Sequence, residues 1–313
     1  MTTHAPTYHR QPVGDVEVFY RAAGPKDAPV LLLLHGFPTA GHMFRDLIPL
    51  LADQYHVIAP DLPGFGNTVA PPRGKFAYTF DTLAAVIDGF TEALGLDRYA
   101  LYIFDYGAPV GLRLAMAHPE RITGIVTQNG NAYLEGFSDT WAPWQAYWAD
   151  PTPAHRAACR ASLAPETIQR DQYLHGADPS RVSPDGVTLD IAYLARPGAD
   201  EIQLDLIGDY RSNVALYPAF QAYFRQHRPP LLAAWAATTR TSCRPAPRPT
   251  GATCPTRRWC CSMPATSRWK PTQPPSRRWC APSWRGFERP RPKQDQGLAS
   301  RPSKDGQPQQ HGE

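Results

Sequence analysis

The residue of this chain best placed to do chemistry is Asp105. It follows the apolar run 99–104, which is typical of a buried strand, and it precedes Gly107 and the helix-forming run 112–117. An acid at the tip of a strand–turn–helix exposes its carboxylate oxygens above the first N–H groups of the helix, where negative charge is stabilised. Such a carboxylate can attack carbon as a nucleophile. The structural alternative is an ordinary helix N-cap, a common place for Asp.

Asp105 must be positioned by the strands and helices around it. Because strand-like and helix-like runs alternate in the sequence, we expect a parallel, doubly wound α/β sheet. Run 30–34 is apolar at every position, which is typical of a strand buried on both faces, whereas 16–21 alternates and predicts an edge strand. Further strands are expected at 56–60, 99–104 and 121–128, and helices near 44–51 and 80–94. Active sites in such sheets lie at the carboxyl ends of the strands. Four polar residues fall at those ends: His35, Asp61, Asp105 and Asn129.

The alternation stops after residue 130. Residues 131–216 are rich in Trp and Tyr, contain helical pieces and show no strand-like run, which predicts a helical cap between a core of residues 1–130 and a return to the core over 217–235. Aromatic side chains of this cap could line an apolar substrate pocket, or they could form the cap's own core. The candidates for substrate binding are Trp141, Trp144, Tyr147 and Tyr210.

Composition narrows the function classes. The 313 residues carry a net charge of +4 and no basic face in the first 235 residues, so we expect a small-molecule substrate and no nucleic-acid partner. There is no apolar run long enough to span a membrane and no signal-like start, so we expect a cytoplasmic protein without a membrane contact. We expect neither a cofactor nor a catalytic metal.

Three motifs carry a resemblance to a known family. They are His35-Gly36-Phe37-Pro38, the run Asp61-Leu62-Pro63-Gly64-Phe65-Gly66, and Phe104-Asp105-Tyr106-Gly107. In this order and spacing they resemble the α/β-hydrolase superfamily, and an acid at the nucleophile elbow resembles its haloalkane dehalogenase and epoxide hydrolase branch. The resemblance covers about residues 10 to 235.

The resemblance implies a two-step hydrolysis. Asp105 would attack an sp3 carbon, displacing halide or opening an epoxide, and a His-activated water would then hydrolyse the alkyl ester. The backbone N–H groups of Phe37 and Tyr106 would form the oxyanion hole, and His35 would be structural. Tyr106 stands where dehalogenases often have a halide-binding Trp, and epoxide hydrolases use cap tyrosines to protonate the opening ring. The sequence does not choose among its tyrosines for that role.

The second half of the expected active site is missing. The family pattern requires an acid after the strand that ends near Trp235 and a His before the last helix, yet no Asp, Glu or His occurs between Arg228 and Phe287. Residues 236–313 are instead rich in Pro, Arg and Cys, and we expect this tail to be irregular. The strand near Trp235 would then be left at the edge of the sheet, where it would favour aggregation.

The genetic code predicts the origin of this tail. Read one nucleotide earlier, the codons after Trp235 permit Gly-Arg-Asn-Asp-Pro-Tyr-Phe-Leu, and those of Arg258–Trp269 permit Val-Val-Leu-Leu-Asp-Ala-Gly-His-Phe-Ala-Leu-Glu. These are an acid-bearing loop and a His-bearing loop typical of the superfamily. The Asp codon straddles Thr238 and Thr239, and the His codon straddles Ala265 and Thr266. We therefore expect a single-nucleotide deletion or sequencing error near Trp235 and Ala236.

Other interpretations of the chain stay open at this stage. The basic, Pro-rich tail could bind nucleic acid, or its cysteines could bind zinc, although they lack paired C-x-x-C spacing. The cysteines concerned are Cys254, Cys260, Cys261 and Cys280. The main alternative to a hydrolase is a catalytically dead protein of the same fold that binds a small apolar ligand.

Overall fold

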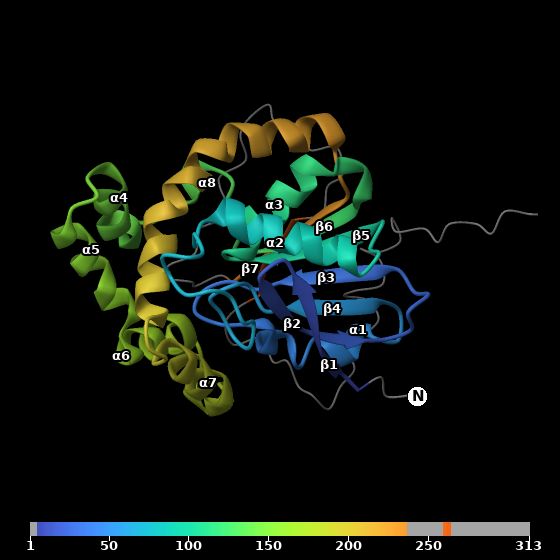
Figure 1. The fold of residues 1–313 in the computed structure, drawn as a ribbon, viewed down its shortest axis with the longest axis horizontal. Coiled ribbons are helices and arrows are strands. Elements are labelled where there is room, and N and C mark those ends of the chain that lie inside the picture. The colour runs from blue at the N-terminus through green and yellow to red at the C-terminus, as the bar shows by residue number, and fades with distance from the viewer. Residues whose placement is uncertain (1–4, 237–258, 264–313) are drawn as a thin grey trace, which may run out of the picture.

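The computed structural model describes residues 5–236 and 259–263. Within these residues the chain forms one sheet of eight strands, in the order β1-β2-β4-β3-β5-β6-β7-β8 (Figure 1). The strands from β4 to β8 pair in parallel, and β2 pairs antiparallel with β1 and with β4. The bounds are β1 Thr7–Val13, β2 Val16–Ala23, β3 Val30–Leu34, β4 His56–Pro60, β5 Tyr99–Phe104, β6 Ile122–Gln128, β7 Leu231–Ala236 and β8 Trp259–Met263. The predicted fold class is confirmed.

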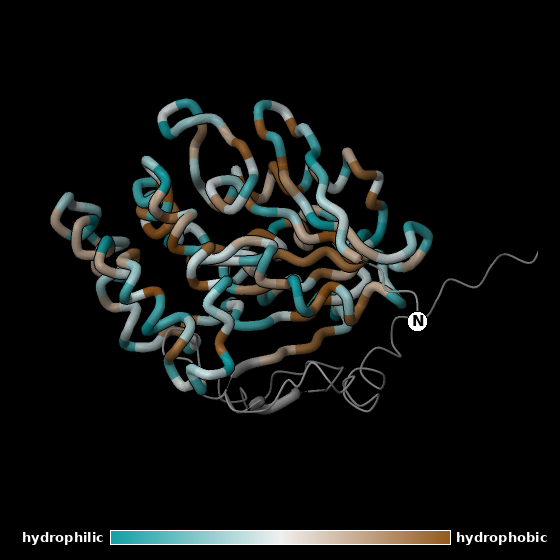
Figure 2. The backbone as a smooth tube through the Cα atoms, turned by 90° about the horizontal axis from the view of Figure 1, so that it is seen from below, coloured by the Kyte–Doolittle hydropathy of each residue, from teal (hydrophilic) through white to brown (hydrophobic). Residues whose placement is uncertain are grey.

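Helices cover both faces of this sheet, which explains the apolar run of β3. Leu32 and Leu34 pack into one core with α2 (Phe80–Ala93), α3 (Gly107–Ala117) and α8 (Ala199–His227). Leu31 and Leu33 pack into the second core with α1 (Ile48–Leu51). All four leucines are completely buried. The apolar colour of Figure 2 accordingly gathers on the central strands.

Local sequence sets the bounds of α2. Thr79 has extended backbone and its side chain accepts a hydrogen bond from the N–H of Thr82, which satisfies one of the free donors of the first turn. Leu83, Ile87 and Phe90 recur at helical spacing and are completely buried against the sheet. The predicted helix over 80–94 is therefore confirmed almost to the residue.

Residues 131–216, here called the helical insertion, hold α4 (Ala142–Ala149), α5 (Pro153–Cys159), α6 (Pro165–Thr167), α7 (Pro184–Leu194) and the first part of α8. Helices α4 to α7 lie to one side of the sheet in Figure 1. The insertion contacts the loops at the carboxyl ends of the strands, since Arg196 donates to the Gly66 carbonyl and the Phe80 N–H donates to Asp209. The expected boundary between residues 216 and 217 falls inside α8, which continues without a break into the core.

Three expectations about the sheet and helices need correction. The strand at 16–21 is not the edge, because β1 pairs along its full length with β2. The predicted helix near 44–51 is two short pieces, a 3₁₀ turn at Gly41–Phe44 and α1. The strand β7 is also not the edge, because β8 from the tail pairs with it in parallel. The sequence fails to predict β1 because a solvated antiparallel strand needs little apolar surface, and five of its seven residues are exposed.

The other expectations for residues 236–313 lie outside the described residues. This holds for Cys254 and Cys280 of the suggested zinc site, and Cys260 and Cys261 are described only through the backbone of β8. Among the described helices, none combines the length and the apolarity that crossing a bilayer requires.

A buried carboxylate, Asp61, joins the loops that follow β3 and β4. Its Oδ1 accepts hydrogen bonds from Arg21 at 2.7 Å and from the Gly41 N–H at 2.8 Å, and its Oδ2 accepts one from the Asn67 N–H at 2.8 Å. Asp61 is completely buried, and the Arg21 side chain is 8% exposed. Asp61 is thus a structural residue, although it lies at a strand end where catalytic acids also occur.

The substitution Asp61→Asn tests this role. It leaves the Arg21 charge buried without its partner, so we expect a loss of about 3 kcal/mol or more in the free energy of unfolding. The matched change Glu17→Gln in the exposed Arg10–Glu17 pair is expected to cost less than about 1 kcal/mol. Urea unfolding of both variants measures the difference, and equal losses would contradict the structural role of Asp61.

Candidate active site

Asp105 lies at the sharp turn between β5 and α3. Its backbone is in the left-handed region, with φ of 46°, a conformation that costs free energy for a residue other than glycine. The turn also packs tightly against β3, since a Cβ on Gly107 would come within 2.3 Å of the Leu34 carbonyl oxygen. The left-handed backbone of Asp105 and the close packing of Gly107 together form the sharp turn between β5 and α3.

The loop after β3 approaches Asp105 from the neighbouring strand. The parallel pairing of Leu34 with Ile103 brings both strand ends to the same level, and the Phe37 N–H donates to Asp105 Oδ1 at 2.7 Å. Gly36 permits this approach, because a Cβ there would come within 2.3 Å of the same oxygen. The geometry brings together Asp105, Phe37 and Tyr106, the three residues that were expected to form the catalytic centre.

The electrostatic environment of Asp105 is mixed. Burial raises the pKa of its carboxyl to about 6, while the backbone N–H groups of Phe37 and Tyr106 act in the opposite direction. The carboxyl is therefore ionised at neutral pH, but at a cost in stability. A desolvated carboxylate with only backbone donors is a better nucleophile than a fully solvated one.

His35 holds the two strand-end loops together. It is completely buried, and its Nε2 accepts a hydrogen bond from the Leu62 N–H at 2.8 Å. Burial lowers the pKa of the imidazole to about 4, so the ring is neutral at physiological pH. Because that nitrogen is already occupied by a backbone donor, the geometry agrees with a structural role and not with that of a base.

A buried cluster between the core and the helical insertion was not predicted from the sequence. His42 Nε2 lies 2.7 Å from Asp190 Oδ1, and the hydroxyl of Tyr173 donates to Asp190 Oδ2. His42 and Asp190 are 148 residues apart, so no spacing in the sequence could have paired them. The cluster fixes α7 over the loop that carries Phe37. Because His42 is bonded to Asp190, it is not available to Asp105. Within the described residues, no hydrogen bond or ion pair joins Asp105 to a histidine.

The aromatic residues expected to bind substrate lie at different distances from the nucleophile. The ring of Tyr210 is 6.0 Å from that of Tyr106, and the ring of Trp141 is 5.2 Å from that of Tyr210. The ring centroids of Trp144 and Trp141 lie 4.9 Å apart, so Trp144 is one ring contact further from Tyr106 than Trp141 is. Tyr210 and Trp141 are thus placed near the candidate site, and Trp144 lies behind them.

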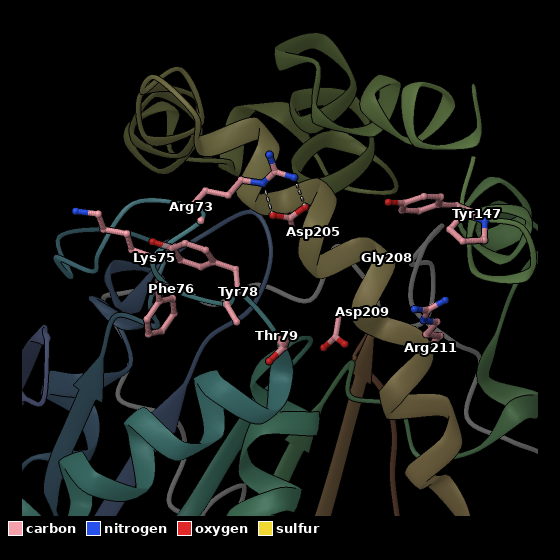
Figure 3. A pocket seen from close by; sticks show the side chains of 13 residues that line it. Arg73, Lys75, Phe76, Tyr78, Thr79, Tyr147, Asp205, Gly208, Asp209 and Arg211 are labelled. Carbon is pink, nitrogen blue, oxygen red and sulfur yellow. Dashed lines mark hydrogen bonds and ion pairs between the residues drawn. The ribbon is translucent and has the colours of Figure 1, made fainter. Parts of the chain in front are cut away.

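Tyr147 lies elsewhere. It lines a pocket of about 870 Å³ formed by the segment 73–79, α8 and the end of α4, which Figure 3 shows from close by. Asp105 and Tyr106 are not among the residues that line it. The Tyr147 hydroxyl accepts a hydrogen bond from Arg156 at 3.1 Å, and Arg73 in the same pocket is paired with Asp205. Tyr147 thus lines a pocket to which neither Asp105 nor Tyr106 contributes.

One group of side chains in the described part of the chain has the types and closeness of metal ligands. Asp88, Glu92 and His118 place their ligand atoms within 4.8 Å of one another. His118 Nε2 already lies 3.0 Å from Asp88 Oδ2, and Arg121 lies 3.5 Å from Asp88 Oδ1. The Asp88 carboxylate thus already has Arg121 and His118 as partners, and the group lies between the end of α2 and the end of α3, away from Asp105.

Comparison with known proteins agrees with this fold. Residues 29–167 match the family model described as alpha/beta hydrolase fold. An uncharacterized hydrolase of Saccharomyces cerevisiae is 48% identical over 235 residues, which is 74% of this chain and 80% of the relative. A haloalkane dehalogenase of Bradyrhizobium diazoefficiens is 36% identical over 138 residues, 44% of this chain and 41% of the dehalogenase.

Solved structures show the same architecture. A haloalkane dehalogenase of Bradyrhizobium elkani superimposes with a TM-score of 0.59 at 22% identity, over 74% of this chain and 80% of that one. The epoxide hydrolase CorEH superimposes with a TM-score of 0.60 at 21% identity, over 74% and 82%. At these identities the likeness concerns the fold alone. The family model and the 48% identity to the yeast hydrolase together show that this chain belongs to the α/β-hydrolase fold family.

The raised pKa of Asp105 predicts a stability cost that grows with pH. A carboxyl whose pKa is higher in the folded state loses stability as the pH rises from its ordinary value of 3.8 through about 6, which corresponds to at most about 3 kcal/mol. Asparagine stays neutral and tolerates the left-handed backbone. We expect Asp105→Asn to raise the free energy of unfolding by up to about 3 kcal/mol at pH 8 and by little at pH 4.

Chemical unfolding at the two pH values measures this difference. The matched substitution Asp97→Asn at an exposed position is expected to leave stability unchanged at both. An Asp105→Asn variant that is less stable than the original chain at pH 8 would show that the ionised carboxylate does not destabilise the folded state.

Proposed function

We propose that this chain is a hydrolase-fold protein whose Asp105 carboxylate attacks a small apolar epoxide or organohalide and forms a covalent alkyl ester. The observation that carries the proposal is the geometry at the elbow: a strained, desolvated carboxylate with one oxygen held by the Phe37 N–H at 2.7 Å. The sequence similarity to a haloalkane dehalogenase supports the choice of an electrophile with an sp3 carbon as substrate.

The first chemical step needs only groups that the described residues supply. One Asp105 oxygen forms a bond to an sp3 carbon, and the bond from that carbon to halide or to ring oxygen breaks with its electron pair. Hydrogen bonds from Phe37 and Tyr106 hold the carboxylate in position for the attack. The aromatic side chains of Phe80, Trp141 and Tyr210 provide the apolar surroundings that favour an uncharged substrate.

The second step needs a base that activates water against the ester. Of the buried histidines near the strand ends, His35 is bonded to Leu62 and His42 to Asp190. Neither of these two histidines is thus free to act as the expected base. We infer that the ester forms in this chain and is not hydrolysed, so that its activity is a single alkylation.

The tail supports a frameshift as the cause. The codons that read Val-Val-Leu-Leu in the shifted frame begin at Arg258 and run through the stretch where the structure has β8. In that frame the Asp would follow β7 and the His would follow β8, both at the carboxyl ends of neighbouring parallel strands. The match to the yeast hydrolase also leaves about a quarter of the chain uncovered, the share that residues 236–313 occupy.

A second candidate function is binding without chemistry. The observation that favours it is the same lack of an available base, because a fold without turnover can still hold a small apolar molecule near Trp141 and Tyr210. The two candidates differ at Asp105: a binding protein leaves the carboxylate unmodified, whereas the proposed hydrolase fold carries an ester.

Incubation with excess styrene oxide tests the first step. We expect intact-mass spectrometry to show one adduct per chain, located at Asp105 by peptide mapping. Because the carboxylate is the nucleophile, the rate should rise with pH and reach its half-maximum near the Asp105 pKa of about 6. Asp105→Asn is the control and should stay unmodified, and an adduct elsewhere or none would remove the proposal.

Restoring the reading frame tests the second step. A gene with one nucleotide added between the codons for Trp235 and Ala236 should encode the shifted tail and give steady diol release with many turnovers per chain. The unaltered gene should give a protein that stops at one equivalent of product. The expected difference is at least about 1,000-fold in product over a long assay, since a missing base removes most of the catalysis of that step. Equal product from both genes would exclude the frameshift as the cause of impairment.

A further inference from the structure

Asp190 is a completely buried carboxylate of α7 that the proposed chemistry does not use. Its Oδ1 lies 2.7 Å from His42 Nε2, and its Oδ2 accepts a hydrogen bond from the Tyr173 hydroxyl. Taking such groups out of water is costly, and a well-packed apolar pair is often at least as stable as a buried ion pair. The arrangement that this cluster fixes therefore explains it better than the stability that it adds.

Hydrogen bonds lead from this cluster to the donor that binds the nucleophile. His42 Nε2 also lies 3.3 Å from the Thr39 hydroxyl oxygen, in the same loop. The Thr39 N–H donates to the Gly36 carbonyl at 3.1 Å, which closes the turn around Phe37. The Phe37 N–H in turn donates to Asp105 Oδ1 at 2.7 Å. The helical insertion is thus connected to the nucleophile through contacts within one short loop.

This loop has two anchors of different kinds. On the side of the core, the Gly41 N–H donates to Asp61 Oδ1 at 2.8 Å. On the side of the insertion, the imidazole of His42 is held by Asp190. The first anchor joins two segments of the core, and it fixes the backbone at a position four residues beyond Phe37. The second anchor makes the position of the loop depend on the position of the insertion.

We propose that Asp190 is a positioning residue, which holds the Phe37 N–H on the Asp105 carboxylate through His42. This inference rests on the proposed function of Asp105 and adds to it a control by the helical insertion. A displaced insertion would release the donor from Asp105, and a closed insertion would restore it. Asp190 acts through the loop and takes part in no bond that forms or breaks.

Loss of the Phe37 donor has a signature that a general loss of stability lacks. This hydrogen bond favours the ionised carboxyl, so its removal raises the pKa of Asp105 above its value of about 6. The titratable group beside Asp105 is the Tyr106 phenol, whose pKa lies well above its ordinary value, so it stays neutral at the pH values concerned. The pH at which alkylation reaches half of its maximal rate therefore reports the position of the loop.

The test measures alkylation of Asp105 by styrene oxide as a function of pH, in the original chain and in His42→Leu. We expect the variant to raise the half-maximal pH by about 0.5 to 1 unit and to lower the maximal rate about tenfold, because the carboxylate loses its orienting donor. The concentration of styrene oxide that gives half of the maximal rate should not change, because Trp141 and Tyr210 stay in place.

Two variants serve as controls. His42→Gln keeps an N–H that can donate to Asp190, so its half-maximal pH should lie within about 0.2 unit of the original value. His118→Leu removes another His–Asp pair, in which His118 Nε2 lies 3.0 Å from Asp88 Oδ2 at the C-terminal end of α3. It should change neither the half-maximal pH nor the maximal rate.

Circular dichroism shows whether His42→Leu is folded. Tyr173→Phe removes one hydrogen bond from the Asp190 carboxylate and leaves its partner His42 in place, so it should shift the half-maximal pH in the same direction by a smaller amount. If His42→Leu does not fold, Tyr173→Phe decides the question.

An unchanged half-maximal pH in the deciding variant would overturn the assignment. A slower reaction at an unchanged half-maximal pH would overturn it as well, because that is what a merely structural role of the cluster produces. If the original chain itself is not alkylated by styrene oxide, the proposed function of Asp105 fails and this inference falls with it, an outcome that is visible before any variant is made.

Discussion

The hydrogen bond from the Phe37 N–H to Asp105 Oδ1 is the contact on which the site depends. It exists because β3 and β5 are parallel neighbours that end at the same level, so that a loop and an elbow far apart in sequence meet. Gly36 and Gly107 make the approach possible, since a Cβ at either position would collide with this junction. The bond also holds an anion in a buried place, where its cost is offset by backbone donors and not by a cation.

Two carboxylates at neighbouring strand ends show how environment divides structure from chemistry. Asp61 has its oxygens occupied by Arg21, Gly41 and Asn67, and it ties the loops in place. Asp105 accepts hydrogen bonds from the backbone N–H groups of Phe37 and Tyr106, in a strained conformation. The same residue type therefore stabilises the fold at one strand end and burdens it at the next, which is the usual relation between stability and an active site.

The sequence was a good guide where one local pattern decides the structure. The uninterrupted apolar run of β3 and the strand–turn–helix at Asp105 both follow from burial on two faces of a parallel sheet, and both are confirmed. It was a poor guide where partners come from distant segments. The pairing of His42 with Asp190, the pocket that Tyr147 lines and the addition of β8 beside β7 depend on packing that no single stretch encodes.

If Asp105 forms the proposed ester and no base follows, the intermediate should persist. The most direct measurement is the lifetime of the Asp105 adduct after free epoxide is removed by rapid gel filtration, followed by intact-mass spectrometry over hours at neutral pH. The proposal predicts that the adduct mass persists and that no diol appears, because His35 and His42 are both engaged with other groups. Decay of the adduct with release of one diol per chain would contradict the claim that the nucleophile works without a base.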